Sequence, residues 1–224
     1  MSPIDTLRKI SFHLPFLLLL GAMSAAAADG IRVLETRSVA GEAADGGQPA
    51  THDLRLQLYA FRGSQWGAGD TVIAIWEAAS LLSQCGIAFS GGELRLLEAP
   101  ERFHDYSMPA ARELVRAVAS TKPAVFFVEN VRDQPGQASE SIVRGDSAAR
   151  PELADTVWLS YGQYDVVLTL AHELVHLLTN SSEHSTESGN LMSAEYAPDN
   201  NRLTPGQCAR LRDRGEANGL LKRR

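Results

Sequence analysis

Cysteine is scarce in this 224-residue chain, which contains only Cys85 and Cys208. In an oxidising compartment an even count is typical of a disulfide, and two cysteines allow only one pairing. We expect that bridge, which would tie the middle of the chain to its end. Two buried free thiols are the alternative.

Basic residues are not in excess either. The chain has 21 Lys and Arg against 27 Asp and Glu, a net charge of -6, which argues against a nucleic-acid partner. The basic tail, Lys222–Arg224, is expected to be solvated. A hydrophobic content of 44% and a charged content of 21% are typical of a globular protein of one domain.

Long apolar runs are missing apart from one near the N-terminus. There, Arg8 and Lys9 precede the leucine-rich run Phe12–Met23, and Ala26–Ala28 provide small residues for cleavage. This pattern predicts a signal peptide over 1–28 and a secreted or periplasmic protein, with an N-terminal anchor as the alternative. We expect a flexible lead-in over 29–50, one domain over 51–224, and no stable membrane association after cleavage.

The most informative stretch reads His172-Glu173-Leu174-Val175-His176. Residues four apart lie on one face of a helix, so His172 and His176 can direct two imidazoles at one metal ion. Glu173 lies one step around the helix, where its carboxylate can reach a water on that metal. The apolar residues of this segment form a stripe on the opposite side: Val166, Leu170, Leu174 and Leu177.

A third histidine, His184, and the sequence Gly189-Asn190-Leu191-Met192 follow this helix. The region resembles the metzincin zinc metalloproteases, most closely their matrixin-like branch, whose motif is H-E-x-x-H-x-x-G-x-x-H followed by a Met-turn. The resemblance implies that His172, His176 and His184 bind one Zn²⁺. It also implies that Glu173 is the general base and that Met192 is the structural methionine of the Met-turn.

The spacing departs from the family motif, because Thr179 stands at its glycine and Ser182 at its third histidine. His184 comes two residues later. We expect the helix to end near Thr179 and to turn at Asn180, since asparagine tolerates the left-handed conformation. Three nearby carboxylates remain alternatives for the third ligand: Glu183, Glu187 and Glu195.

Hydrophobic periodicity predicts an α+β domain. The expected strands are 54–60, 87–89, 93–97, 124–131, 156–160 and an edge segment at 141–144, and the expected helices are 71–84, 109–120, 166–179 and one from Thr204 onward. The resemblance implies a mixed, mostly parallel twisted sheet with an active-site helix and a small C-terminal subdomain ending in a helix. The remaining histidines, His13, His52 and His104, lack partners at ligand spacing and are expected to be signal or surface residues.

These features together predict a monomeric zinc endopeptidase. Glu173 would take a proton from the zinc-bound water and pass it to the leaving amine. The resemblance implies that the peptide or protein substrate lies along an edge strand, here 141–144 or the neighbouring loop, and Tyr196 would stabilise an oxyanion or pack in the specificity wall. A non-catalytic zinc-binding interaction domain and a peptidoglycan amidase are the alternatives. No cysteine precedes the domain, so an inhibitory thiol on the zinc is not available.

Overall fold

The computed structural model describes residues 30–42, 49–134, 137–139, 141–144, 150–162 and 165–224. The predicted signal peptide over 1–28 lies outside these residues. The strands and helices, in chain order, are β1 (Arg32–Glu42), β2 (His52–Phe61), α1 (Ala68–Leu82), η2 (Ser83–Cys85), β3 (Ile87–Glu98), η3 (Glu101–Phe103), β4 (Asp105–Tyr106), α2 (Met108–Ala117), β5 (Ala124–Val128), β6 (Asn130–Gln134), β7 (Gln137–Ser139), β8 (Ser141–Arg144), η4 (Pro151–Leu153), β9 (Thr156–Ser160), α3 (Val166–Thr179), α4 (Pro205–Ala217) and β10 (Leu221–Arg223).

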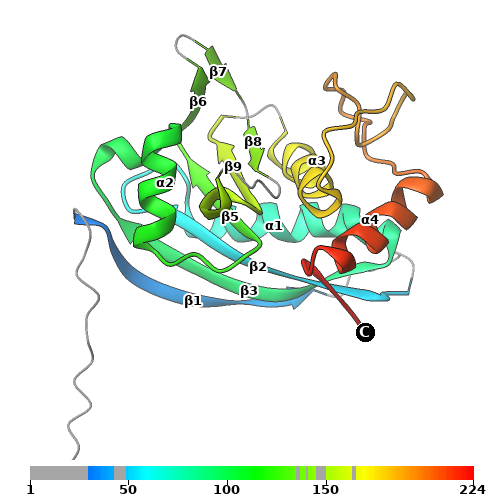
Figure 1. Ribbon diagram of the computed structural model, residues 1–224, viewed down its shortest axis with the longest axis horizontal. Helices are drawn as coiled ribbons and strands as arrows, with labels where there is room; N and C mark the ends of the chain where they lie inside the picture. The colour runs from blue at the N-terminus through cyan, green and yellow to red at the C-terminus, as the bar shows by residue number, and fades with distance from the viewer. Residues whose placement is uncertain (1–29, 43–48, 135–136, 140, 145–149, 163–164) are drawn as a thin grey trace, which may run out of the picture.

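Within the described part of the chain, seven strands form the main sheet, in the order β1-β3-β2-β5-β9-β8, with β10 also beside β2. The neighbouring pairs β3–β2, β2–β5 and β5–β9 are parallel, whereas the edge strands β1 and β8 are antiparallel to their neighbours. Strands β4, β6 and β7 form a smaller sheet, and its β6–β7 hairpin projects from the body of the protein (Figure 1). The predicted α+β class and mostly parallel twisted sheet are confirmed.

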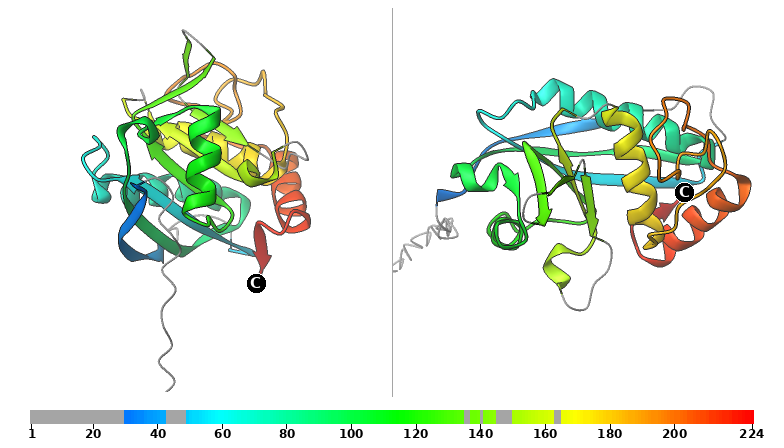
Figure 2. Two further views of the ribbon diagram at one scale, coloured as in Figure 1. Left: turned by 60° about the vertical axis from the view of Figure 1, so that its left-hand side comes forward. Right: turned by 90° about the horizontal axis from the view of Figure 1, so that it is seen from above.

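The alternating side chains of the central strands divide the core between the two faces of the sheet. On β2, Leu58 and Ala60 face α1 and α3, while Tyr59 and Phe61 face α2. Figure 2 shows these helices on opposite sides. On the α2 face, the register places Tyr59, Phe126 and Trp158 side by side, with neighbouring rings stacked 4.5 and 4.1 Å apart between centroids. Such pairs each add about 0.5–1.5 kcal/mol beyond the burial of their area.

The prediction of a flexible lead-in over 29–50 is wrong for Arg32–Glu42, which form β1. This strand pairs along its length with β3, from Arg32 opposite Glu98 to Glu42 opposite Phe89. An edge strand obtains its order from backbone hydrogen bonds, and most of the β1 side chains face solvent. A clear apolar pattern was therefore absent from a segment that is nevertheless ordered.

Strand β3 is continuous, although the sequence predicted a break at residues 90–92. Gly91 has a φ of +103°, and a Cβ on Gly92 would collide with the backbone carbonyl of Leu56 on β2. These glycines permit a close approach of adjacent backbones, so they are part of the sheet rather than a turn. Further along, the strand predicted over 124–131 divides at Glu129 into β5 and β6.

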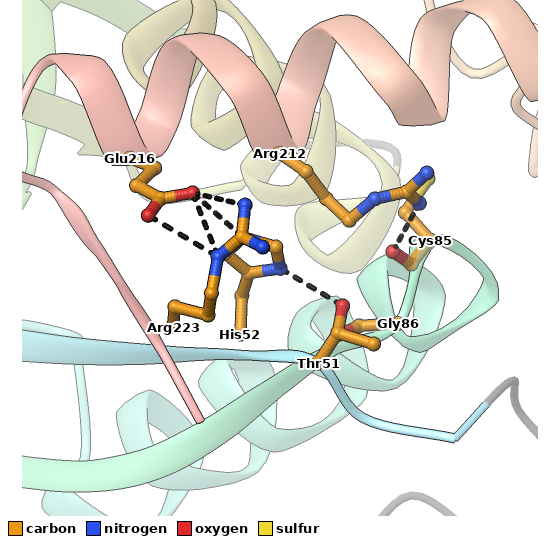
Figure 3. Close-up of polar contacts among 7 residues, drawn as sticks. All are labelled: Thr51, His52, Cys85, Gly86, Arg212, Glu216 and Arg223. Carbon is orange, nitrogen blue, oxygen red and sulfur yellow. Dashed lines mark hydrogen bonds and ion pairs between the residues drawn. The ribbon is translucent and has the colours of Figure 1, made fainter.

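The C-terminus is attached to the sheet, which corrects two expectations (Figure 3). Lys222–Arg224 are exposed, as expected for a solvated tail, although the backbone of 221–223 forms β10 and Arg223 pairs with Glu216 at 2.9 Å. His52, expected on the surface, is 4% exposed because β10 and α4 cover it, and its ring lies 3.4 Å from Glu216 and 2.9 Å from the Thr51 hydroxyl. The helix predicted from Thr204 onward is α4, which a capping box at Thr204 opens, but the chain continues into β10 rather than ending in that helix.

The predicted disulfide between Cys85 and Cys208 is present, with Cα atoms 4.8 Å apart, and joins η2 to α4 across 123 positions of sequence. Next to it, the Arg212 guanidinium donates a hydrogen bond to the Cys85 carbonyl at 2.8 Å (Figure 3). Helix α4 is therefore fixed to the end of α1 by a covalent bond and a charged hydrogen bond.

Replacement of both cysteines by serine should lower the free energy of unfolding by roughly 2–5 kcal/mol, because the cross-link restricts a long loop in the unfolded chain. Chemical denaturation followed by circular dichroism at a fixed metal concentration measures the change. The wild-type protein under reducing conditions should behave like the double variant. A denaturation midpoint equal to that of the oxidised wild type would contradict the prediction.

Candidate metal centre

Helix α3 holds two imidazoles on one face. The Asp165 carboxylate caps its first turn by accepting hydrogen bonds from the backbone amides of Val167 and Leu168, each at 3.0 Å. The apolar stripe of the helix is buried in the core, which turns the opposite side toward a pocket. His172 and His176 lie there one turn apart, with ring centroids separated by 4.6 Å.

The third imidazole, that of His184, comes from the loop after α3. The helix ends at Thr179, and Asn180 adopts the left-handed conformation with φ 47° and ψ 47°, as predicted from the sequence. The chain then returns through 181–183 and brings His184 beside the helix. Its Nε2 atom lies 3.3 Å from that of His176. A loop two residues longer than the family motif therefore still returns a histidine to the same place.

The three rings converge on one point. The Nε2 atoms of His172 and His176 are 2.9 Å apart, and one ligand atom from each of the three residues lies within 4.8 Å of the others. Ligands on a tetrahedral zinc ion with Zn–N bonds of about 2.0–2.1 Å are separated by about 3.3 Å, so the spacing fits. The group could hold a metal ion. Among the described residues, it contains none of the alternative carboxylates, Glu183, Glu187 and Glu195.

Backbone carbonyls set the orientation of two of these rings. His172 donates through Nδ1–H to the carbonyl of Leu191 at 2.7 Å, and His176 donates through Nδ1–H to the carbonyl of Ser181 at 2.7 Å. A neutral imidazole that uses its Nδ1 proton in this way presents the Nε2 lone pair. Both α3 histidines therefore point metal-binding nitrogens toward His184.

The environment of His176 and His184 favours the neutral imidazole. Burial lowers the pKa of His176 to about 4, and repulsion from His172 contributes further. Desolvation and then the same repulsion also lower the pKa of His184. Because an imidazole binds a metal ion through a lone pair, a depressed pKa leaves these nitrogens available at neutral pH.

A turn at 189–193 lies beneath the cluster and contains the methionine predicted for the Met-turn. Met192 is 3% exposed and belongs to the core formed with α3. Its carbonyl accepts a hydrogen bond from the Ser185 amide at 2.7 Å, and Ser185 and Ser193 form a parallel bridge. The segment that carries His184 is thus paired directly with the turn.

An open pocket of about 250 Å³ lies at the cluster. His172, His184 and Glu173 contribute to its lining, together with Tyr196, which is 50% exposed. Glu173 therefore lines the same pocket as two of the three imidazoles. Tyr196 forms part of the wall, as expected in one of its two predicted roles.

Several groups that shape the site were not predicted from the sequence. The carbonyls of Ser181 and Leu191 have no signature, because every residue carries one. The sequence pattern gave no sign that the side chains of Asn190 and Gln207 bond to each other. The one sequence signal available for this pair was an asparagine directly before Leu-Met.

No protein-family profile matches the chain, and no curated protein matches it. Among solved structures, the chain is similar to metalloproteinase-II from Bacteroides fragilis, at 15% sequence identity and a TM-score of 0.48. The similarity covers 79% of this chain and 58% of that protein, so the chain spans less than two thirds of its length. A likeness this distant says nothing of activity, and the function proposed below rests on the imidazoles and Glu173.

Replacement of His184 by alanine should weaken metal binding by more than about 100-fold, the upper range for changes outside the ligand set. The matched variant Glu187→Ala removes an exposed carboxylate from the same loop and should keep the wild-type metal content. Metal per chain, measured by mass spectrometry after dialysis, separates the two variants. Loss of metal from Glu187→Ala with retention in His184→Ala would reverse the assignment.

Metal retention should persist well below the ordinary histidine pKa of about 6.5. A lowered pKa means that the imidazole stays neutral as the pH falls from 6.5 and competes with protons only near its own value, about 4 for His176. Zinc content after dialysis should therefore remain complete at pH 6 and fall as the pH approaches 4. Half-maximal loss at pH 6.5 or above would contradict this expectation.

Proposed function

We propose that this protein is a zinc-dependent endopeptidase with a metzincin-like catalytic centre. The observation that carries the proposal is the convergence of three imidazoles, two of which line one open pocket together with Glu173. Three imidazoles around a tetrahedral ion leave one position for water or substrate, which is the arrangement of catalytic rather than structural zinc. Nitrogen ligands of this kind suit zinc among the available divalent metals.

Each residue then has a defined task. A zinc ion held there would supply Lewis-acid chemistry, lowering the pKa of the attacking water and polarising the substrate carbonyl. Glu173 accepts the proton of that water and transfers it to the leaving amine, so that the peptide bond breaks into a carboxylate and an amine. His172, His176 and His184 hold the ion, and the Leu191 and Ser181 carbonyls keep two of these rings in the required tautomer.

The substrate is proposed to be an extended peptide lying beside β8. This strand pairs with β9 on one side, and it forms the end of the main sheet as far as the chain is described. Helix α3 lies close to β8, so a peptide added to this edge would run past the imidazoles. Backbone hydrogen bonds to β8 would then hold the scissile carbonyl near Glu173.

A secreted or periplasmic location is part of the proposal. The Cys85–Cys208 disulfide is typical of proteins that fold in an oxidising compartment. In the part of the chain that the structure describes, no helix has the length and apolar character needed to cross a membrane.

The substitution Glu173→Gln should leave zinc content unchanged and reduce peptide cleavage at least about 100-fold, because the amide cannot accept the proton. Glu195→Gln is the matched control, since it neutralises another carboxylate that lines the same pocket. Hydrolysis of casein or of a quenched fluorescent peptide is the measurement. Equal rates for Glu173→Gln and wild type would show that the mechanism is wrong.

Purified sacculi, as a second substrate beside the peptides, address the alternatives. Purified sacculi cleaved by the wild type but not by Glu173→Gln, with no cleavage of peptides, would replace the endopeptidase by a peptidoglycan amidase. Stoichiometric zinc with no hydrolysis of either substrate would instead identify a non-catalytic zinc-binding domain. The position of Glu173 in the pocket favours an enzyme, because a structural zinc needs no base.

A further inference from the structure

A pair of side-chain amides joins the turn at 189–193 to helix α4. Asn190 donates through Nδ2 to Oε1 of Gln207 at 2.9 Å, and Gln207 donates through Nε2 to Oδ1 of Asn190 at 3.1 Å. The backbone amide of Met192 also donates to Oδ1 of Asn190 at 2.9 Å, and that of Thr204 donates to Oε1 of Gln207 at 2.8 Å. Since only the oxygen of an amide accepts, those donors determine the orientation of both groups. Asn190 is 3% exposed, so the loss of a partner would be costly.

The turn held by Asn190 binds the imidazole of His172 and the backbone next to His184. The Leu191 carbonyl accepts the Nδ1 proton of His172 at 2.7 Å. The Met192 carbonyl accepts the amide of Ser185 at 2.7 Å, directly after His184. Two histidines from different elements therefore depend on the position of consecutive carbonyls.

On the other side, Gln207 belongs to a rigid support. Its side chain completes the capping box of α4 with Thr204, and the next residue, Cys208, is bonded to Cys85. Figure 3 shows that α4 is also anchored at Arg212 and Glu216. The helix therefore provides a fixed reference for the turn.

We propose that Asn190 and Gln207 form an amide latch that positions His172 and His184 for metal binding. The inference rests on the proposed metal centre and adds to it residues that do not touch the metal. Partners outside the ligand set typically change metal affinity 10–100-fold. The turn also pairs with Arg202 through the amide of Leu191 at 2.7 Å, so loss of the latch shifts the turn without removing its main-chain support.

The test is a double-mutant cycle on zinc affinity, measured by competition with a chelating dye. Asn190→Ala and Gln207→Ala should each weaken zinc binding about 10–100-fold. The double variant should lose less zinc affinity than the product of the two single losses, because both substitutions break the same connection between the turn and α4. The Co²⁺ absorption spectrum should change in the same variants, since the His172 and His184 rings are less restrained.

Two additional variants separate positioning from folding. Asn218→Ala removes another amide on α4, which donates to the Leu178 carbonyl of α3 at 3.1 Å, and should keep wild-type zinc affinity. Gln207→Glu keeps the acceptor of the capping box but places a carboxylate oxygen against Oδ1 of Asn190, so it should weaken zinc binding with α4 intact. Thermal melts of the metal-free proteins record the stability of each variant.

The outcomes separate failure of the latch from failure of the proposed zinc-dependent function. A wild-type protein without stoichiometric zinc would remove the proposed function. Zinc binding by the wild type, with Asn190→Ala and Gln207→Glu unchanged in affinity, would remove the latch and leave the metal centre. Equal losses in Asn218→Ala and Asn190→Ala, or additive losses in the cycle, would show that general destabilisation is the cause.

Discussion

Three imidazole nitrogens that face one another are the constraint on which this protein depends. The two α3 histidines use their Nδ1 protons on backbone carbonyls, so the Nε2 lone pairs that meet at 2.9 Å would repel each other. A cation between them converts that repulsion into coordination. Protonation of an imidazole would also relieve the repulsion, but burial opposes it and lowers the pKa of His176. The position and the tautomers of these imidazoles, and the lowered pKa of His176, therefore fit a group that could hold a metal ion.

The scaffold supplies this convergence from three directions. The apolar face of α3 packs on the main sheet together with α1, which aims the first two rings. A left-handed residue at Asn180 reverses the chain and returns His184. The turn at 189–193 holds His172 and the segment after His184 through main-chain carbonyls. Each direction uses a different kind of interaction, so the geometry does not depend on hydrophobic packing alone.

Helix α4 and the disulfide give the small C-terminal part a fixed place. The segment between α3 and α4 has little regular structure and many exposed side chains. The disulfide joins α4 to η2, which directly follows α1, and β10 after α4 pairs with β2. The C-terminal end of this segment is therefore tied to the core. A metal centre with one ligand on such a loop needs this support, because a loop alone loses too much conformational entropy on ordering.

The sequence by itself determined the class of the fold, the metal-binding helix, its end near Thr179 and the single cysteine pairing. These features follow from periodicity, from the αL tolerance of Asn180 and from the count of two cysteines. The spacing alone left the third ligand open between His184 and nearby carboxylates, and only the folded loop brought His184 to the other rings. Strand β1, the burial of His52 and the Asn190–Gln207 pair were decided by tertiary structure, since each depends on residues distant in the chain that no local pattern connects.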